Sequence, residues 1–273
     1  MAVRVGIVDY LNSRPLAWAF REGAESGPFV PFHLPPAEVA QQLATGSLDI
    51  GLIPSIEVQR IPGLRLIPGL CIAATHEVRS VLLISKVQPR QIRRLALDQN
   101  SRTSVALAKI ILCRRYGVAP ECVSQPPNVK TMMQQADAAL VIGDPALRVS
   151  VADYRVLDLA EEWRRLTGLP FVFAVWAVRA GIAADGLLPF FNRSLQQGLG
   201  NLDELIAEAG EQLELAPEEL REYLTVSLSF RLGNEELAGL REFYSLAAEM
   251  DLIAEARPLQ FLGSCPSQDD SVE

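Results

Sequence analysis

A turn rich in hydroxyl groups is the strongest chemical feature of the sequence. Ser101, Arg102, Thr103 and Ser104 follow a short apolar run and open a stretch of helical periodicity that ends at Gly117. Ser101 is the expected N-cap of that helix. Backbone N–H groups and hydroxyls at a helix start favour a nearby anion. An ordinary capped helix explains the same pattern, and the residues alone do not separate the two interpretations.

Further polar residues stand beside predicted strands. Asn12 follows the strand predicted for 3–8, at the sheet edge where α/β proteins bind ligands, but asparagine also caps helices, and the residues alone favour the cap. Ser55 follows a buried strand and an Ile-Pro step, and could supply a donor. Ser80 precedes an apolar strand, and a lone serine in that place is usually only exposed.

The sequence offers no obvious dedicated base. Asp144 ends a predicted strand, and a role as helix cap before Pro145 explains it. As a base it would face repulsion from an anionic substrate. The only histidines are His33, expected to be structural, and His76, whose role the sequence leaves open.

These residues need a scaffold, and the hydrophobic pattern predicts one. Strands at 3–8, 29–32 and 48–53 alternate with helices that begin at Pro15 and Pro36. This β-α-β-α-β order predicts a parallel sheet with helices on its faces.

A second unit interrupts the first. It begins with the strand 95–97 and the helix 102–116, and everything after the strand-like run 169–178 is predicted to be helical. The chain is therefore expected to cross twice between two lobes, near 84–87 and 171–178, with a ligand cleft at the hinge. The predicted lobes are 1–86 with 174–273, and the inserted 87–173. This is the layout of a two-lobed, periplasmic-binding-protein-like type 2 α/β fold.

The composition of the chain argues against several classes of function. A formal net charge of −8 without a basic tract argues against a nucleic-acid partner. No run approaches the roughly 20 apolar residues of a membrane span, and the first residues do not resemble a signal peptide. We expect a cytoplasmic protein without a metal. Free thiols, buried at least at the first two positions, are expected for the four cysteines, Cys71, Cys113, Cys122 and Cys265.

Five segments carry a family resemblance: DYLNSRPL at 9–16, SVLL at 80–83, SRTSVAL at 101–107, ALVIGD at 139–144 and DLAEEWRRLTGLPFVFA at 158–174. The chain resembles the menaquinone-biosynthesis family that holds chorismate dehydratase and 1,4-dihydroxy-6-naphthoate synthase. The match extends to about Val178 and is weaker beyond it. Gly143 and Asp144 stand where the synthase branch usually carries a histidine, which favours the dehydratase branch.

The resemblance implies loss of water from chorismate in the futalosine route, giving 3-[(1-carboxyvinyl)oxy]benzoate, with no cofactor. Asn12 and Ser80 are then assigned to catalysis. The residues assigned to substrate binding are Tyr10, Ser55, Ser101, Arg102, Thr103, Ser104 and Asp144. We expect Thr103 and Ser104 to grip one of the two carboxylates of chorismate. The proton acceptor is expected to be the enolpyruvyl carboxylate of the substrate itself, with Asp144 as the alternative.

Two other functions compete. A carboxylate-binding receptor or sensor shares the fold, but we expect a receptor to carry a signal sequence or anchor and a sensor to carry a partner module. The sister synthase is the nearest enzymatic rival. No obligate protein partner is evident, because the apolar face of a helix predicted at 235–250 is enough to dock on the first lobe.

Overall fold

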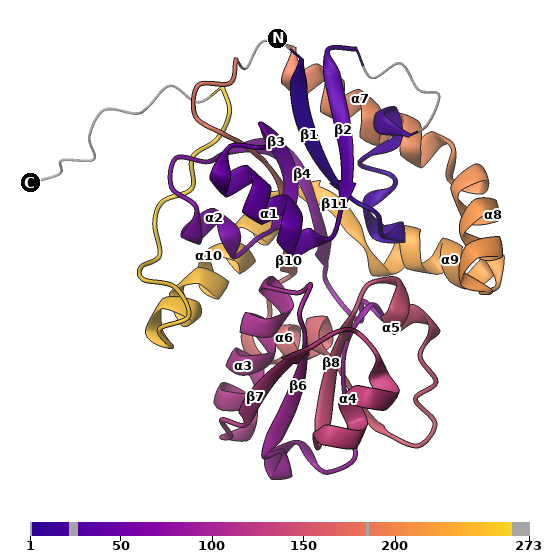
Figure 1. The fold of residues 1–273 in the computed structure, drawn as a ribbon, viewed down its shortest axis with the longest axis vertical. Coiled ribbons are helices and arrows are strands. Elements are labelled where there is room, and N and C mark those ends of the chain that lie inside the picture. The colour runs from indigo at the N-terminus through magenta and orange to yellow at the C-terminus, as the bar shows by residue number, and fades with distance from the viewer. Residues whose placement is uncertain (1, 22–26, 184–185, 264–273) are drawn as a thin grey trace, which may run out of the picture.

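The computed structural model describes residues 2–21, 27–183 and 186–263, which fold into two α/β lobes (Figure 1). The first lobe contains a sheet of order β11-β4-β10-β3-β1-β2 and the second a sheet of order β7-β6-β8-β5-β9. The strands are β1 (Val3–Val8), β2 (Phe29–Leu34), β3 (Ile50–Pro54), β4 (Arg65–Ala74), β5 (Val81–Ser85), β6 (Arg94–Asp98), β7 (Glu121–Gln125), β8 (Ala138–Ile142), β9 (Arg155–Asp158), β10 (Phe171–Val178) and β11 (Ser229–Leu232).

Helices cover both sheets and fill the end of the chain. The α-helices are α1 (Pro36–Thr45), α2 (Glu57–Arg60), α3 (Thr103–Tyr116), α4 (Val129–Gln135), α5 (Asp144–Arg148), α6 (Leu159–Thr167), α7 (Leu187–Gly200), α8 (Leu202–Leu213), α9 (Pro217–Glu222) and α10 (Asn234–Glu249). The short 3-10 turns are η1 (Leu11–Ser13), η2 (Trp18–Phe20) and η3 (Pro89–Gln91), and η4 (Tyr223–Ser227) is a π-helix.

The predicted parallel unit is present in the first lobe, where β1 pairs in parallel with both β2 and β3. Gly6 and Gly51 are paired in β1 and β3 beneath α1. A Cβ atom at Gly6 would lie 2.7 Å from Val39 of α1, and one at Gly51 would lie 2.8 Å from it. The two glycines therefore let α1 pack directly against the backbone of the sheet.

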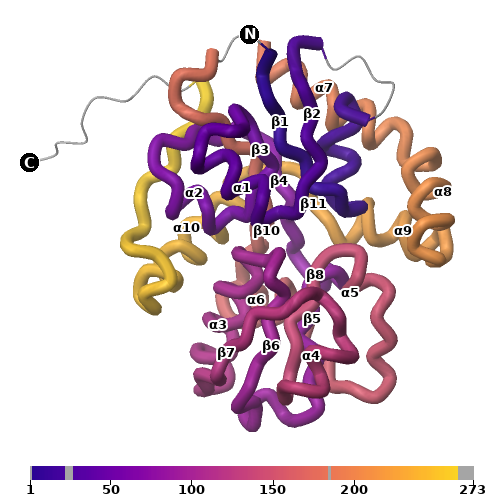
Figure 2. Tube along the Cα trace, viewed as in Figure 1, coloured from indigo at the N-terminus to yellow at the C-terminus, as the bar shows by residue number. Residues whose placement is uncertain are grey.

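The two crossings between the lobes lie earlier than predicted. The limits 1–86, 87–173 and 174–273 place β5 in the first lobe, but β5 pairs antiparallel with β8 and β9 in the second sheet. The sheets change instead between Ala74 and Val81, and again between Asp158 and Phe171 (Figure 2). A short, fully buried apolar strand such as β5 carries no local signal of the sheet that it joins.

Some elements differ from those predicted from the sequence. The helix predicted from Pro15 is replaced by the turns η1 and η2, and the helix predicted from 183 begins at Leu187. The predicted all-helical end contains the strand β11, and β7 was also not predicted. Both of these strands are sheet edges with polar residues, so their hydrophobic pattern is weak.

The core of the first lobe is aromatic. Trp176 packs edge-on against Phe191 with ring centroids 4.7 Å apart, and Phe171 contacts Phe243 at 4.9 Å. Trp163 of α6 is fully buried and donates its indole N–H to the Pro170 carbonyl at 3.1 Å. The helix α10 packs against β10 and β11, so its predicted docking on the first lobe is confirmed.

The cysteine predictions are partly correct. Cys71 is buried and free, as expected, and Cys122 is free and half-buried. Cys113 is also free, but it is exposed, so the prediction of a buried thiol there was wrong. An apolar run within a helix still turns some positions outward. Cys265 lies outside the described residues.

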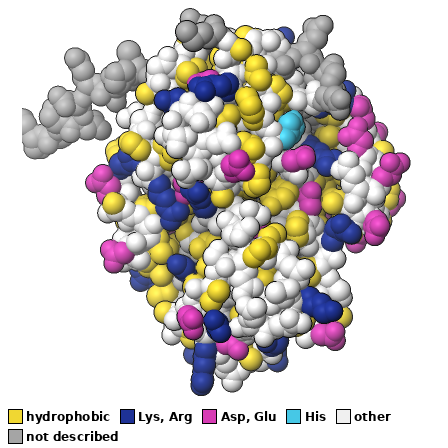
Figure 3. Space-filling view, viewed as in Figure 1, with side chains coloured by type: hydrophobic (Ala, Val, Ile, Leu, Met, Phe, Trp, Pro, Cys, Tyr) yellow, Lys and Arg dark blue, Asp and Glu magenta, His cyan; other side chains and the backbone are white. Residues whose placement is uncertain are grey.

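Figure 3 shows cationic and anionic side chains interspersed over one face of the molecule, with acidic groups gathered along the edge formed by α8 and α9. On this face the described residues make no continuous basic field of the kind that attracts nucleic acid. Within the described ranges, no helix combines the length and the apolar character needed to cross a membrane.

Two glycines of α7 give a test of how this helix packs against the first lobe. A Cβ atom at Gly198 would lie 2.2 Å from the Pro15 carbonyl oxygen, whereas one at Gly200 would meet no atom within 4 Å. We expect Gly198→Ala to lower the free energy of unfolding by about 1–3 kcal/mol, because backbone must shift. Gly200→Ala should be neutral or raise it by about 0.5 kcal/mol. Denaturant titration measures both, and equal effects would contradict this arrangement.

Candidate functional site

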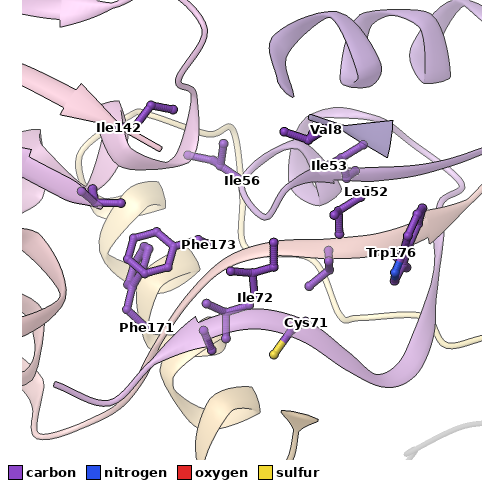
Figure 4. Close-up of a cluster of buried hydrophobic side chains, with 14 of the residues drawn as sticks. Val8, Leu52, Ile53, Ile56, Cys71, Ile72, Ile142, Phe171, Phe173 and Trp176 are labelled. Carbon is purple, nitrogen blue, oxygen red and sulfur yellow. The ribbon is translucent and has the colours of Figure 1, made fainter. Parts of the chain in front are cut away.

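A pocket lies between the lobes, beside the two crossings. It contains about 610 Å³ not filled by protein atoms, part of it open to solvent. Val8, Leu52 and Phe173 contribute apolar walls from the first lobe, and Ile142 contributes one from the second (Figure 4). The polar residues of the lining are Tyr10, Asn12, Ser80, Asn100, Ser101, Arg102, Thr103 and Ser104.

The first turn of α3 forms one wall of the pocket. The helix begins at Thr103, with Arg102 as its N-cap, and no side chain caps it. The prediction that Ser101 caps this helix was therefore wrong, because the helix starts one residue later than predicted and Arg102 occupies the N-cap position. Ser101 and Ser104 instead line the pocket, where they are almost fully buried. Backbone N–H groups in this first turn have no intrahelical partner and suit an anion.

Thr103 links the lobes as well as lining the pocket. Its hydroxyl accepts a hydrogen bond from the Ile56 backbone N–H of the first lobe at 3.2 Å. Ser55, predicted to bind substrate, is near it at 3.4 Å but does not line the pocket, and its hydroxyl donates to the Val172 carbonyl at 2.7 Å. A role of Ser55 in binding stays a prediction.

Arg102 also bridges the lobes. Its guanidinium contacts the Glu57 carboxylate of α2 at 2.8 Å, and Arg60 contacts the other oxygen of Glu57 at 2.8 Å. The Glu57 side chain is only 3% exposed, so both contacts hold a carboxylate that water does not reach. A buried carboxylate is tolerated only when it is paired in this way.

Asp144 makes a further contact between the lobes. Its carboxylate accepts the backbone N–H of Leu11 at 3.0 Å. It does not line the pocket, and Gly143 rather than Asp144 is the N-cap of α5, so the predicted cap was wrong. Burial raises the pKa of Asp144 above its ordinary value. The Tyr10 ring covers Gly143, and burial raises the pKa of Tyr10 to about 12.

Asn12 and Ser80, which the family resemblance assigned to catalysis, both line the pocket. Their catalytic roles stay predictions. Ser80 is fully buried, and its hydroxyl has no partner among the described residues. The preceding residue, Arg79, has a positive φ of 62°. This uncommon backbone conformation is stabilised by Asp158, whose carboxylate accepts the N–H groups of Val78 at 3.0 Å and Arg79 at 2.7 Å.

Sequence reasoning missed Tyr223. It is the first residue of the π-helix η4, a distortion that is frequent at functional sites. Ser80 and Asn12 both lower the pKa of Tyr223, which places them close to its hydroxyl, although burial raises this pKa more strongly. Neither forms a regular hydrogen bond with it, and the hydroxyl is buried without a partner among the described residues. An orphan of this kind costs about 1–3 kcal/mol.

Asp98 was also missed as a functional group, although it precedes the hydroxyl-rich turn. It is 1% exposed, one carboxylate oxygen accepts the Asn100 N–H at 2.9 Å, and the other has no partner among the described residues. Burial raises its pKa to about 6. Its charge in turn helps to raise the pKa of Tyr10. A partly unpaired buried acid beside a pocket is typical of a functional site.

The residues that line the pocket share one chemical property. Among the described residues that form it, only Tyr10 and Arg102 have ionisable side chains, and none carries a carboxylate, imidazole or amine. The pocket therefore supplies hydrogen bonds, a helix N-terminus and apolar walls. It can orient and stabilise an anionic ring, but its own side chains offer no ordinary base.

Comparison with known proteins identifies the family of this chain. A family model described as menaquinone biosynthesis matches residues 3–249. The chain belongs to this family. It is 29% identical over 259 residues to the chorismate dehydratase of Thermus thermophilus, covering 88% of this chain and 93% of that protein. It is 30% identical over 166 residues to the chorismate dehydratase of Campylobacter jejuni, covering 60% of this chain and 58% of that protein.

The solved structures establish the fold of this menaquinone-biosynthesis family member. The alkanesulfonate-binding protein SsuA from Xanthomonas axonopodis, bound to MOPS, superposes with a TM-score of 0.67 at 19% identity, covering 95% of each chain. The predicted α/β fold of the periplasmic-binding-protein type is confirmed. At this identity the likeness shows architecture alone.

Asp98 gives a prediction with a defined pH dependence. Because its pKa is raised from 3.8 to about 6 in the folded state, the folded protein holds this proton more tightly than the unfolded chain. The stability that protonated Asp98 contributes is therefore fully present below pH 3.8 and is lost as the pH rises through about 6. Asp98→Asn removes the charge and keeps the acceptor for Asn100. We expect it to raise the free energy of unfolding at pH 7.5 by up to about 3 kcal/mol, and little at pH 4.

Asp158→Asn is the control for this substitution. Asp158 is also a buried acid with a raised pKa, but both of its oxygens accept backbone N–H groups. An asparagine amide cannot replace both oxygens, so this variant should be less stable than the parent at every pH. Urea titrations between pH 4 and pH 8 measure both variants. A pH-independent effect of Asp98→Asn would contradict the raised pKa.

Proposed function

We propose that this chain dehydrates chorismate to 3-[(1-carboxyvinyl)oxy]benzoate in menaquinone biosynthesis. Membership of the family and two relatives named chorismate dehydratase support this proposal. The observation that carries it is the lining of the pocket, which combines uncharged donors with a helix N-terminus and lacks a carboxylate, imidazole or amine among its described residues. Such a lining suits a dianionic ring acid that needs orientation more than it needs a protein base.

The reaction balances without an electron donor or acceptor. The C3–H bond breaks and its electron pair is delocalised through the ring diene into the ring carboxylate. The C4–O bond then breaks, and the departing hydroxyl takes up a proton and leaves as water. Aromatic stabilisation drives this second step. The protein has to hold the ring, stabilise the developing enolate and guide one proton.

The enolpyruvyl carboxylate of chorismate is the proposed acceptor of the C3 proton. It is part of the bound substrate and is therefore already in the pocket, whereas Asp144 lies outside the lining and accepts the Leu11 N–H. Asn12, from the turn after β1, and Ser80, from the first crossing, hold this carboxylate over C3. Intramolecular placement of a base gives a large effective concentration, which offsets its modest basicity.

The second carboxylate of the substrate is assigned to α3. Ser104, Thr103 and Ser101 line the pocket around the first turn of this helix, whose N–H groups and dipole favour an anion. Tyr10 closes the pocket from the first lobe by covering Gly143. Arg102 contributes positive charge nearby, although its guanidinium is engaged by Glu57.

The direct test is incubation of the purified protein with chorismate, followed by chromatography and mass spectrometry. We expect an aromatic enolpyruvyl ether that is lighter than chorismate by one water. Chorismate that binds tightly and is recovered intact would overturn the proposal and support a receptor. Ser80→Ala and Asn12→Ala should each lower kcat by about 100-fold or more, the loss typical of one stabilising donor.

Asn128→Ala is the control for Asn12→Ala. Asn128 caps α4, away from the pocket, by accepting the Thr131 N–H at 3.0 Å. Its loss should cost about 1 kcal/mol of stability and leave kcat unchanged. If Asn128→Ala lowered kcat as much as Asn12→Ala, the effect of Asn12 would be one of stability alone.

The source of the base has its own test. A chorismate analogue with the enolpyruvyl carboxylate converted to an amide keeps the ring and its leaving group. We expect its aromatisation to be slower by about 100-fold or more, because the acceptor of the proton is lost. An undiminished chemical rate for the analogue, together with an inactive Asp144→Asn variant, would assign the base to Asp144 instead.

A further inference from the structure

Two buried hydroxyl groups next to the pocket, those of Ser80 and Tyr223, lack regular hydrogen-bond partners among the described residues and lie close to each other. The Ser80 and Tyr223 side chains are 0% and 1% exposed, and neither hydroxyl has a hydrogen-bond partner among the described residues. Buried hydroxyls are nearly always paired, so two adjacent exceptions require an explanation. Ser80 also lines the pocket, whereas Tyr223 does not. Tyr223 is therefore a neighbour of Ser80 that lies outside the lining of the pocket.

The fold holds Tyr223 in this place from several directions. The helix before it, α9, approaches the first crossing through Glu219, which contacts Arg79 at 3.6 Å. The Tyr223 carbonyl accepts the Leu228 N–H at 3.2 Å, closing the π-helix, and Leu228 lines the pocket. The phenol thus reaches the Ser80 and Asn12 side chains from the C-terminal segment of the first lobe.

A second buried tyrosine shows the ordinary arrangement. Tyr244 of α10 is 2% exposed and donates its hydroxyl to the Ser55 carbonyl at 2.6 Å. Its hydrogen bond is complete without any ligand. The contrast with Tyr223 indicates that the Tyr223 hydroxyl is placed for a contact that forms only when the pocket is occupied.

We propose that Tyr223 is a positioning residue that donates its hydroxyl to Ser80 Oγ, so that the Ser80 hydroxyl turns its own hydrogen toward the substrate. A serine hydroxyl can accept one such bond while donating another. Hydrogen bonds in series strengthen one another, which makes Ser80 a better donor to a carboxylate. This assignment rests on the proposed dehydratase function and extends it to a residue outside the pocket lining.

The test is a double-mutant cycle on chorismate turnover with Tyr223→Phe, Ser80→Ala and the combination of both. Tyr223→Phe should lower kcat about tenfold with KM changed less than about twofold. Because Tyr223 acts through Ser80, the double variant should be no slower than Ser80→Ala. Tyr244→Phe is the control, and we expect it to lower the melting temperature with kcat within about twofold of the parent.

The outcomes separate the two proposals. If the parent protein converts chorismate, either of two results would overturn the role of Tyr223 alone. One is a pair of kcat losses that multiply in the double variant, and the other is no loss of kcat in Tyr223→Phe. A parent protein that leaves chorismate intact would overturn the proposed function and this assignment together. If Tyr223→Phe does not fold, 3-fluorotyrosine at position 223 replaces it. Its more acidic hydroxyl should change kcat in the parent and not in the Ser80→Ala background.

Discussion

The buried carboxylate of Asp158 is the contact on which the geometry of the pocket depends. One of its oxygens accepts the N–H groups of Ala160 and Glu161 and so caps α6, and the other accepts those of Val78 and Arg79. The second pair fixes the first crossing between the lobes in a conformation with a positive φ at Arg79. The direction of the Ser80 side chain follows from that conformation. A single acid thus joins the scaffold of the second lobe to the edge of the pocket that Ser80 lines.

The lobes are held together by the same segments that line the pocket. Thr103 and Arg102 at the start of α3 bond to the segment around α2, and on the other side Asp144 bonds to the Leu11 backbone. The contacts that hold the lobes together therefore also shape the pocket. SsuA, an alkanesulfonate-binding protein, shares this architecture. The difference in function has to reside in the residues of the lining.

Much of the fold was predictable from local patterns. The parallel unit of β1, β2 and β3 followed from alternating apolar runs and helix starts, and α3 followed from its periodicity and the glycine at its end. The sheet joined by β5 was not predictable, because its partners β8 and β9 are distant in the sequence. The edge strands β7 and β11 were missed because half-exposed polar strands carry little hydrophobic signal.

The sequence by itself determined where polar groups gather, since side chains at strand ends and helix starts lie at one edge of an α/β sheet. The residues alone favoured a helix cap for Asn12 and an exposed position for Ser80. The family resemblance assigned both to the site, and both line the pocket. Only the tertiary structure decided the partners of these groups. Tyr223 approaches Ser80 from the far end of the chain, and the loss of a partner at Asp98 depends on burial. Neither property is local, because burial and orphaned hydrogen bonds exist only once distant segments have packed together.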